Sequence, residues 1–202
     1  MSIRRSSQQN RCPKCLVHTN NCYCEKIIPT ELLSKVSIIL FKKEKFLPSN
    51  TAIVTSKSLT NTETFIRGNK DSFMNDSFVD SENYHPLYLY PTDDSIELTQ
   101  DFVSTIKKPI NLIVPDGTWR QTKKIHKREP LLRDITKVRV TSKNKSIYPL
   151  RRQKFDYGLC THEAIAHALK IIENEVIYEK MIENLNTMIK AHLINRQIHN
   201  KL

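Results

Sequence analysis

Glycine is scarce in this sequence, with three residues among 202, and no Gly/Ser-rich linker or low-complexity tract is present. This composition excludes a collagen-like protein and a flexible, Gly/Ser-rich one. Long apolar runs are also missing. No stretch approaches the roughly 20 apolar residues that cross a bilayer, so we expect no membrane partner. The basic first ten residues lack the apolar core of a secretory signal, which predicts a cytoplasmic protein.

Positive charge is concentrated in one part of the chain. The net charge is +11, from 32 Lys and Arg against 21 Asp and Glu. The window 120–154 contains 13 basic residues and only two acidic ones, Glu129 and Asp134, so it accounts for the whole excess. A basic window of this kind predicts a nucleic-acid partner. A lysine-rich surface that only keeps the protein in solution is the alternative.

Cysteine is infrequent as well, but four of the five cysteines fall within thirteen residues: Cys12, Cys15, Cys22 and Cys24. Their spacing, C-x2-C-x6-C-x-C, can place four thiolates around one tetrahedral ion. Zinc is the expected metal, and an iron–sulfur cluster is the alternative. A disulfide framework suits a cytoplasmic chain poorly. Because four thiolates leave no open coordination position, we predict a structural zinc site.

Short β-branched runs alternate with helical patterns after the cysteines. Strands are expected at 36–41, 87–90, 110–114 and 137–140. Helices are expected at 50–59, 95–108, 118–128, 161–174 and 176–197, with an irregular connection at 60–82. The alternation predicts an α/β domain over residues 29–202, with a mainly parallel sheet flanked by helices. Residues 1–28 would form a small metal-binding segment in front of it.

In a parallel α/β sheet, ligands bind at the carboxyl ends of the strands. Three expected loops meet that description: 91–94, 115–119 and 157–163. The second contains Asp116 at a strand end, then Gly117, which permits a tight turn, and Thr118, which can cap the next helix. A carboxylate held in this way suits a general base or an orienting group. The structural alternative is an Asx-turn with Trp119 packed in the core behind it.

Five segments of the chain, in order, resemble the DTW domain family. They are the cysteine cluster, Leu47-Pro48-Ser49-Asn50-Thr51, Leu89-Tyr90-Pro91-Thr92, Asp116-Gly117-Thr118-Trp119 and Gly158-Leu159-Cys160-Thr161-His162-Glu163-Ala164. The Asp-x-Thr-Trp motif alone is short, but several ordered motifs between residues 11 and 196 make a chance match a poor explanation. Two positions depart from the family pattern: Cys160 stands where serine is expected, and Ala52 stands where glycine is common.

The resemblance implies a SPOUT-related fold, whose C-terminal half can be knotted. It also implies transfer of the 3-amino-3-carboxypropyl group from S-adenosylmethionine to N3 of a uridine in tRNA, with release of methylthioadenosine. Asp116 would be the catalytic residue, either as the base for the N3 proton or as the group that orients the imide. Cys160 is expected to be a small pocket residue, because the reaction needs no covalent intermediate.

Residues of the three loops would hold the cofactor. They are Pro91, Pro115, Gly117, Thr118, Trp119, Leu159, Cys160, Thr161 and Glu163. The helix N-terminus at Thr161 suits the carboxylate of the amino-acid end, while Glu163 would accept from its ammonium group or only complement the helix dipole. Trp119 either stacks on a base or packs behind the turn. The expected phosphate contacts are Arg120, Lys123, Lys124, Arg151 and Arg152.

Three other functions are compatible with these patterns. They are a SPOUT-type RNA methyltransferase with the same cofactor, a non-catalytic zinc-containing RNA-binding module, and an enzyme that modifies ribosomal RNA. The mass of the modified nucleoside and the binding of S-adenosylmethionine distinguish them. No obligate protein partner is indicated. His126, His162 and His167 are expected to be structural or exposed.

Overall fold

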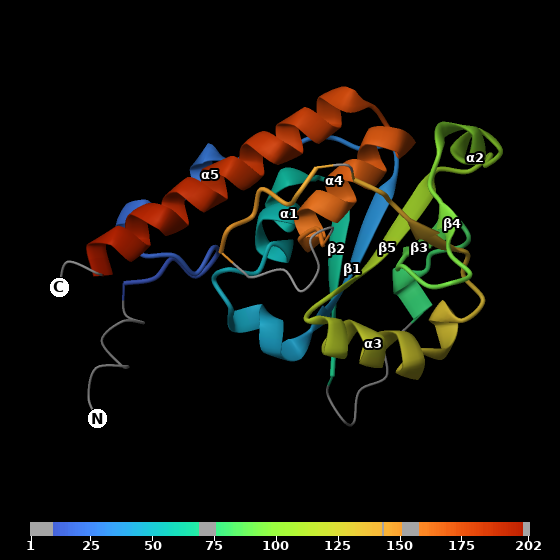
Figure 1. The fold of residues 1–202 in the computed structure, drawn as a ribbon, viewed down its shortest axis with the longest axis horizontal. Coiled ribbons are helices and arrows are strands. Elements are labelled where there is room, and N and C mark those ends of the chain that lie inside the picture. Colours follow the sequence, from blue (N-terminus) through green and yellow to red (C-terminus); the bar gives the residue numbers. More distant parts are fainter. Residues whose placement is uncertain (1–9, 69–75, 143, 151–157, 200–202) are drawn as a thin grey trace.

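Six strands form one sheet in the computed structural model, which describes residues 10–68, 76–142, 144–150 and 158–199 (Figure 1). The strand order is β2-β1-β5-β3-β6-β4, and the pairings between these strands are parallel. The strands are β1 (Lys35–Phe41), β2 (Thr62–Arg67), β3 (His85–Leu89), β4 (Ile96–Glu97), β5 (Ile110–Asp116) and β6 (Lys137–Arg139). The expected parallel α/β architecture is therefore confirmed.

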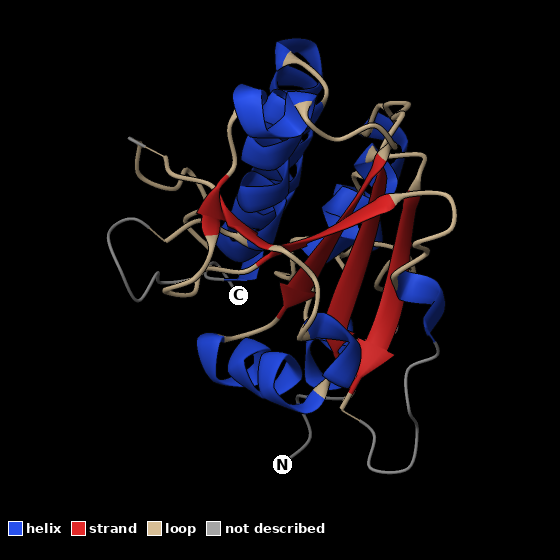
Figure 2. Cartoon of the chain, turned by 90° about the vertical axis from the view of Figure 1, so that its right-hand side faces the viewer, coloured by secondary structure: helices blue, strands red, loops and turns tan. Residues whose placement is uncertain are grey.

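Helices flank this sheet on both faces (Figure 2). The α-helices are α1 (Ala52–Ser58), α2 (Gln100–Ser104), α3 (Trp119–Arg128), α4 (Thr161–Ile172) and α5 (Glu175–His199). The 3-10 helices are η1 (Thr19–Asn21), η2 (Cys24–Lys26), η3 (Lys42–Phe46), η4 (Asp76–Phe78) and η5 (Pro130–Leu132). Within the described ranges, none of the helices is both long enough and apolar enough to cross a membrane.

Alternating side chains of the central strands build two cores. Val36 and Ile38 of β1 pack with α1, α2, α4 and α5 on one face, where Ile165 and Leu169 of α4 are fully buried. Ile39 points to the other face and joins a second core with α3, η4 and η5. Because both faces of the sheet are covered, the central strands are apolar at nearly every position. That continuous apolarity is what made them recognisable in the sequence.

The irregular connection expected at 60–82 is wrong over Thr62–Arg67, which forms β2. This strand pairs with β1 from Val36↔Thr62 to Phe41↔Arg67 and lies at the edge of the sheet. Its residues are exposed or half-buried. A strand at the edge of a sheet covers little of the core. It therefore lacks the long apolar run that predicts a buried strand in a sequence.

The helix expected at 95–108 is largely wrong. Only Gln100–Ser104 is helical, as α2, and Ile96–Glu97 forms β4 beside β6. Thr99 explains where the helix begins, because its side chain accepts a hydrogen bond from the backbone N–H of Phe102 at 3.2 Å. The remaining expected elements are confirmed within a few residues of their bounds. The knotted C-terminal half stays a prediction.

The carboxyl ends of β1 and β5 lie next to each other. Their register pairs Ile39 with Pro115 and Leu40 with Asp116. β3 pairs with β5 on its other side. The chain therefore leaves three neighbouring strands at one edge of the sheet, where α3 begins (Figure 1). This edge is where a ligand site is expected in a parallel sheet.

Candidate functional site

A cavity of about 720 Å³ opens at this edge of the sheet. Its walls come from the ends of β3 and β5, the starts of α3 and α4, and the segments before α1 and after β6. Ten of the expected site residues line it: Pro91, Pro115, Asp116, Gly117, Thr118, Trp119, Arg120, Leu159, Cys160 and Thr161. The volume is in the range that accommodates a small organic ligand. The structure thus brings the three expected loops together.

Asp116 ends β5 and is only 3% exposed. Its carboxylate accepts hydrogen bonds from two separate segments. Nδ2 of Asn50 donates to Oδ2 at 2.5 Å, and Oγ1 of Thr161 donates to Oδ1 at 2.5 Å. Short bonds to a charged acceptor are stronger than neutral ones and fix its direction. The carboxylate is therefore held in one orientation at the cavity wall.

Asn50 is a site residue that the sequence patterns did not single out. It is 1% exposed, and its Oδ1 accepts a hydrogen bond from the backbone N–H of Ala52 at 2.7 Å. Because the amide oxygen is engaged there, the NH2 group faces Asp116. The only sequence signal for this residue is its place in the segment 47–51.

The turn after Asp116 requires glycine. Gly117 has a φ of +155°, and a Cβ at this position would lie 2.9 Å from Oε1 of Gln121. That oxygen already accepts a hydrogen bond from the backbone N–H of Thr118 at 2.6 Å. The bond satisfies one of the free N–H groups at the start of α3. Gly117 therefore lets Gln121 fold back over the helix N-terminus beside the cavity.

The start of α4 is fixed by Glu163. Its Oε2 accepts hydrogen bonds from the backbone N–H of Cys160 at 2.9 Å and from Oγ of Ser146 at 2.6 Å, and its Oε1 accepts from the N–H of Ile147 at 2.7 Å. Glu163 does not belong to the cavity wall, unlike the other expected cofactor residues. Its bonds join the segment 146–147 to α4. Burial raises the pKa of the Cys160 thiol well above its usual value, which keeps that thiol neutral.

Trp119 lies at the rim of the cavity. The ring is 42% exposed, so the alternative prediction, that it packs in the core behind the turn, is wrong. The helix that begins with Trp119 is held against the sheet by other rings. His126 stacks on Tyr90, with centroids 4.7 Å apart, and on Tyr88, with centroids 5.9 Å apart. His126, with the buried Thr122 and Ile125, thus forms the inner face of α3, and the outer face is free to carry charge.

His162 is fully buried beneath the cavity. Its Nε2 lies 2.8 Å from the backbone oxygen of Met181 in α5, and its Nδ1 lies 2.8 Å from Oγ1 of Thr55 in α1. A carbonyl oxygen only accepts, so Nε2 carries the proton and donates. Burial lowers the pKa of His162 to about 4, against the opposing effect of the Met181 carbonyl. His162 is therefore a neutral structural residue that joins three helices.

This burial makes stability depend on pH. The unfolded chain protonates the imidazole below its ordinary pKa of about 6.5, whereas the folded chain keeps it neutral until about pH 4. Stability contributed by His162 is therefore present above pH 6.5 and lost as the pH falls towards 4. Between pH 7 and pH 5 we expect this residue to lower the free energy of unfolding by about 2 kcal/mol.

Urea unfolding of His162→Gln should show a free energy of unfolding that depends less on pH, by that amount. Parallel curves for the native and His162→Gln proteins would contradict this account.

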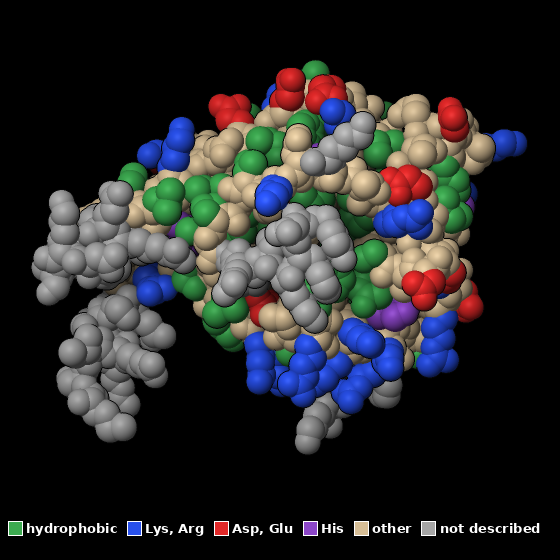
Figure 3. Space-filling model, in the orientation of Figure 1, with side chains coloured by type: hydrophobic (Ala, Val, Ile, Leu, Met, Phe, Trp, Pro, Cys, Tyr) green, Lys and Arg blue, Asp and Glu red, His purple; other side chains and the backbone are tan. Residues whose placement is uncertain are grey.

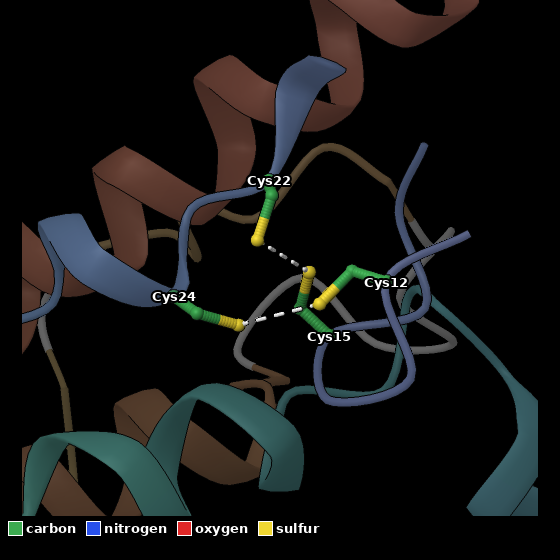
Figure 4. A group of neighbouring side chains, drawn as sticks. All are labelled: Cys12, Cys15, Cys22 and Cys24. Atoms are coloured by element: carbon green, nitrogen blue, oxygen red, sulfur yellow. Dashed lines mark hydrogen bonds between the residues drawn. The ribbon is translucent and has the colours of Figure 1, made fainter. Parts of the chain in front are cut away.

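The four clustered cysteines point towards one another (Figure 4). The Sγ atoms of Cys12 and Cys24 are 3.8 Å apart, as are those of Cys15 and Cys22. All four sulfur atoms lie within 4.8 Å of one another. A zinc ion with Zn–S bonds of about 2.3 Å separates its sulfurs by about 3.8 Å in a tetrahedron. The donor set and spacing therefore fit one tetrahedral ion, and they favour it over a cluster of several irons, which would spread the thiolates further apart.

The cysteine segment packs on α5. Cys15, Val17 and Tyr23 are almost completely buried in a cluster that includes Leu185 and Met188 of that helix. Asn184 of α5 adds polar contacts to the same segment. Its Oδ1 accepts from the backbone N–H of Ile28 at 3.2 Å, and its Nδ2 donates to the Ile28 oxygen at 3.1 Å. The metal site and α5 therefore stabilise each other.

Exposed basic residues follow the outer face of α3. They are Arg120, Lys123, Lys124, Lys127 and Arg128. Arg120 also lines the cavity, so the positive surface continues to its rim. Figure 3 shows Lys and Arg side chains gathered along the lower edge of the molecule, where α3 lies in Figure 1. The other expected phosphate contacts, Arg151 and Arg152, lie outside the described residues.

Comparison with known proteins agrees with this arrangement. The DTW domain model matches residues 9–193. A Drosophila melanogaster protein named tRNA-uridine aminocarboxypropyltransferase 2 is 25% identical over 96% of this chain and 80% of its own length. Proteins of the same name from Macaca fascicularis and Mus musculus are 32% identical over 53% of this chain and 36% of their own length.

One solved structure is also similar, the SAM-dependent rRNA:acp-transferase Tsr3 from Vulcanisaeta distributa. It has a TM-score of 0.48 and 20% sequence identity, and the match covers 83% of this chain and 81% of that one. The family model, by contrast, spans the cysteine cluster, the Asp116 turn, α4 and most of α5. The chain therefore belongs to the DTW domain family.

Proposed function

We propose that this protein is a tRNA-uridine aminocarboxypropyltransferase. It would transfer the 3-amino-3-carboxypropyl group of S-adenosylmethionine to N3 of a uridine. The observation that carries the proposal is the fixed carboxylate of Asp116 in the wall of a 720 Å³ cavity, within the motif of the DTW family. The shared name of relatives from three animals, tRNA-uridine aminocarboxypropyltransferase 2, supports the same reaction.

S-adenosylmethionine supplies an electrophilic carbon next to its sulfonium, and the amino-acid end must be held so that this carbon faces the uridine. The N-terminus of α4 at Thr161, beside Leu159 and Cys160, suits the carboxylate of that end. Pro91, Pro115, Gly117 and Thr118 would enclose the rest of the donor. Trp119 would stack on adenine or on a base at the rim. Glu163 would not contact the donor directly. It would instead hold the start of α4 in place through its hydrogen bonds.

Asp116 would act on the uridine imide. N3 is a poor nucleophile while it carries its proton, so a carboxylate nearby can remove that proton or accept a hydrogen bond from it as N3 attacks. Both carboxylate oxygens already accept hydrogen bonds from Asn50 and Thr161. These bonds fix the direction of the carboxylate, so positioning would contribute to the rate beside any proton transfer.

The remaining expected residues would bind the RNA or support the fold. Arg120, Lys123 and Lys124 of α3, with Arg151 and Arg152 after them in the chain, would contact the tRNA phosphates. Residues 1–28 would form a structural zinc segment, and residues 29–202 the catalytic domain. Cys12, Cys15, Cys22 and Cys24 would hold the zinc ion. These cysteines do not line the cavity, so the ion would take no part in the transfer.

The decisive experiment is to incubate the purified protein with S-adenosylmethionine and unmodified tRNA transcripts and to measure the masses of the released nucleosides by mass spectrometry. The proposal expects aminocarboxypropyl-uridine and an equal amount of methylthioadenosine. A methylated uridine would identify a methyltransferase instead. RNA binding without any binding of S-adenosylmethionine in calorimetry would identify a non-catalytic module. Product on ribosomal RNA but on no tRNA would show that ribosomal RNA is the substrate.

Asn50 provides a prediction about positioning. Asn50→Ala removes the hydrogen bond to Oδ2 of Asp116, and we expect the turnover number to fall about 10- to 100-fold with little change in KM for tRNA. Asn50→Asp places a second carboxylate within hydrogen-bond distance of Asp116, so the pair would share a proton. The acid limb of its pH–rate profile should therefore move to higher pH. A structural role alone predicts loss of stability in both variants and no shift of the profile.

A further inference from the structure

A second basic element lies beside α3. The helix η3 (Lys42–Phe46) follows β1 directly, as α3 follows β5, and these two strands are parallel neighbours. Both elements therefore leave the same edge of the sheet. The backbones approach closely there, since a Cβ on Gly117 would lie 3.4 Å from Cβ of Phe41. Residues that are about 80 positions apart in the sequence thus form one surface.

The outer face of η3 is positive and aromatic. Lys43 and Lys45 are exposed, and neither forms an ion pair within the part of the chain that the structure describes. Glu44, the acidic residue of this element, is 2% exposed and turned inwards. Phe46 is 72% exposed, with Nζ of Lys45 6.0 Å from its ring centroid. An exposed phenyl ring beside a lysine gains nothing from the core, and it offers a surface on which a base can stack.

The cavity is lined by residues that adjoin both elements. Ser49 lies three residues after η3, and Trp119 and Arg120 lie at the start of α3. In Figure 3 the Lys and Arg side chains gather along the lower edge, over the region where η3 and α3 lie in Figure 1. Each of the two elements therefore offers one exposed aromatic ring, Phe46 in η3 and Trp119 in α3, together with a set of cations.

We propose that η3, beside α3, is a second RNA-binding element for an unpaired loop of the tRNA. This proposal rests on the proposed function. N3 of uridine forms the Watson–Crick hydrogen bond, so the target base must be unpaired before N3 can react, and its neighbours then lie in a loop. Proteins bind such loops by cationic contacts to phosphates and by stacking of splayed bases on aromatic rings. Lys43 and Lys45 would contact the phosphates, and Phe46 would stack on a base next to the target uridine.

Two sets of variants test the two contacts. Lys43→Glu with Lys45→Glu should weaken binding of unmodified tRNA transcripts at least about tenfold and reduce the slope of log K against log salt by about two, one for each lost phosphate contact. Lys180→Glu with Lys190→Glu, on the exposed face of α5, makes the same change in net charge and should leave the slope unchanged. Phe46→Ala should weaken binding about fivefold or more with the native slope. Leu33→Ala, at a side chain that is 82% exposed, is its control.

Unfolding curves of each variant will show that the fold is retained, because these side chains lie at the surface. Native affinity and native salt slope in both η3 variants would overturn the proposal, whatever product the native protein makes. If the native protein makes no aminocarboxypropyl-uridine and the η3 variants still bind tRNA less tightly than their controls, the proposed function fails and the RNA-binding role of η3 stands.

Discussion

Asp116→Ala is expected to reduce formation of aminocarboxypropyl-uridine at least about 1000-fold, while the protein still binds tRNA and S-adenosylmethionine. A positioned acid–base group contributes roughly 10²–10⁴ to the rate, and this carboxylate also holds two other side chains of the site. Removing it leaves the Asn50 amide and the Thr161 hydroxyl without their acceptor. The measurement is single-turnover product formation with saturating S-adenosylmethionine, together with calorimetry for each ligand.

Asp116→Asn separates the two roles of the carboxylate. The amide keeps the shape but can accept at only one position, so it cannot satisfy both Asn50 and Thr161. If Asp116 is the base, activity of this variant should rise steeply with pH, because free uridine loses its N3 proton in alkaline solution. If Asp116 orients the imide, the loss should be similar at every pH. Asp101→Asn on the exposed side of α2 is the control and should keep native turnover. Native turnover in Asp116→Ala would remove Asp116 from the mechanism.

The sequence predicted those parts of the site whose residues are close together in the chain. The four cysteines fall within thirteen positions, so their spacing alone indicated one cluster, and the structure brings their sulfurs within 4.8 Å. The turn from Asp116 to Trp119 was equally local. The hydrogen bond from Asn50 to Asp116 joins residues 66 positions apart, and it exists because β1 and β5 are neighbours in the sheet. No local pattern in the sequence predicts that these two residues are in contact.

The errors in the fold have related causes. β2 forms at the edge of the sheet, where hydrogen bonding to β1 stabilises a strand in which four of six residues are polar, so its pattern resembled a loop. β4 is two residues long and exists only because β6 lies beside it. The hydrogen bonds of Glu163 to Ser146 and Ile147 were likewise not evident from the sequence, and its role towards the cofactor stays a prediction. Each of these outcomes depends on tertiary contacts.

Loss of the metal is expected to destabilise the whole protein. Structural zinc contributes about 10–16 kcal/mol to the folding of isolated zinc-finger peptides at neutral pH. Here the cysteine segment shares a buried cluster with Leu185 and Met188, so its unfolding would expose one side of α5. We expect Cys15→Ser to lose about 5 kcal/mol or more, which lowers the melting temperature by about 10–20 °C in a chain of this length.

Metal content provides the direct measurement for this prediction. The native protein should carry one zinc per chain by elemental analysis and show no visible absorption, whereas iron with a coloured spectrum would identify an iron–sulfur site. Cys160→Ser makes the same chemical change outside the cluster, and it should retain one zinc. Zinc release should also increase in acid, because protons compete for the thiolates. A Cys15→Ser protein with a full equivalent of zinc and a native melting temperature would show that the four cysteines do not form the metal site.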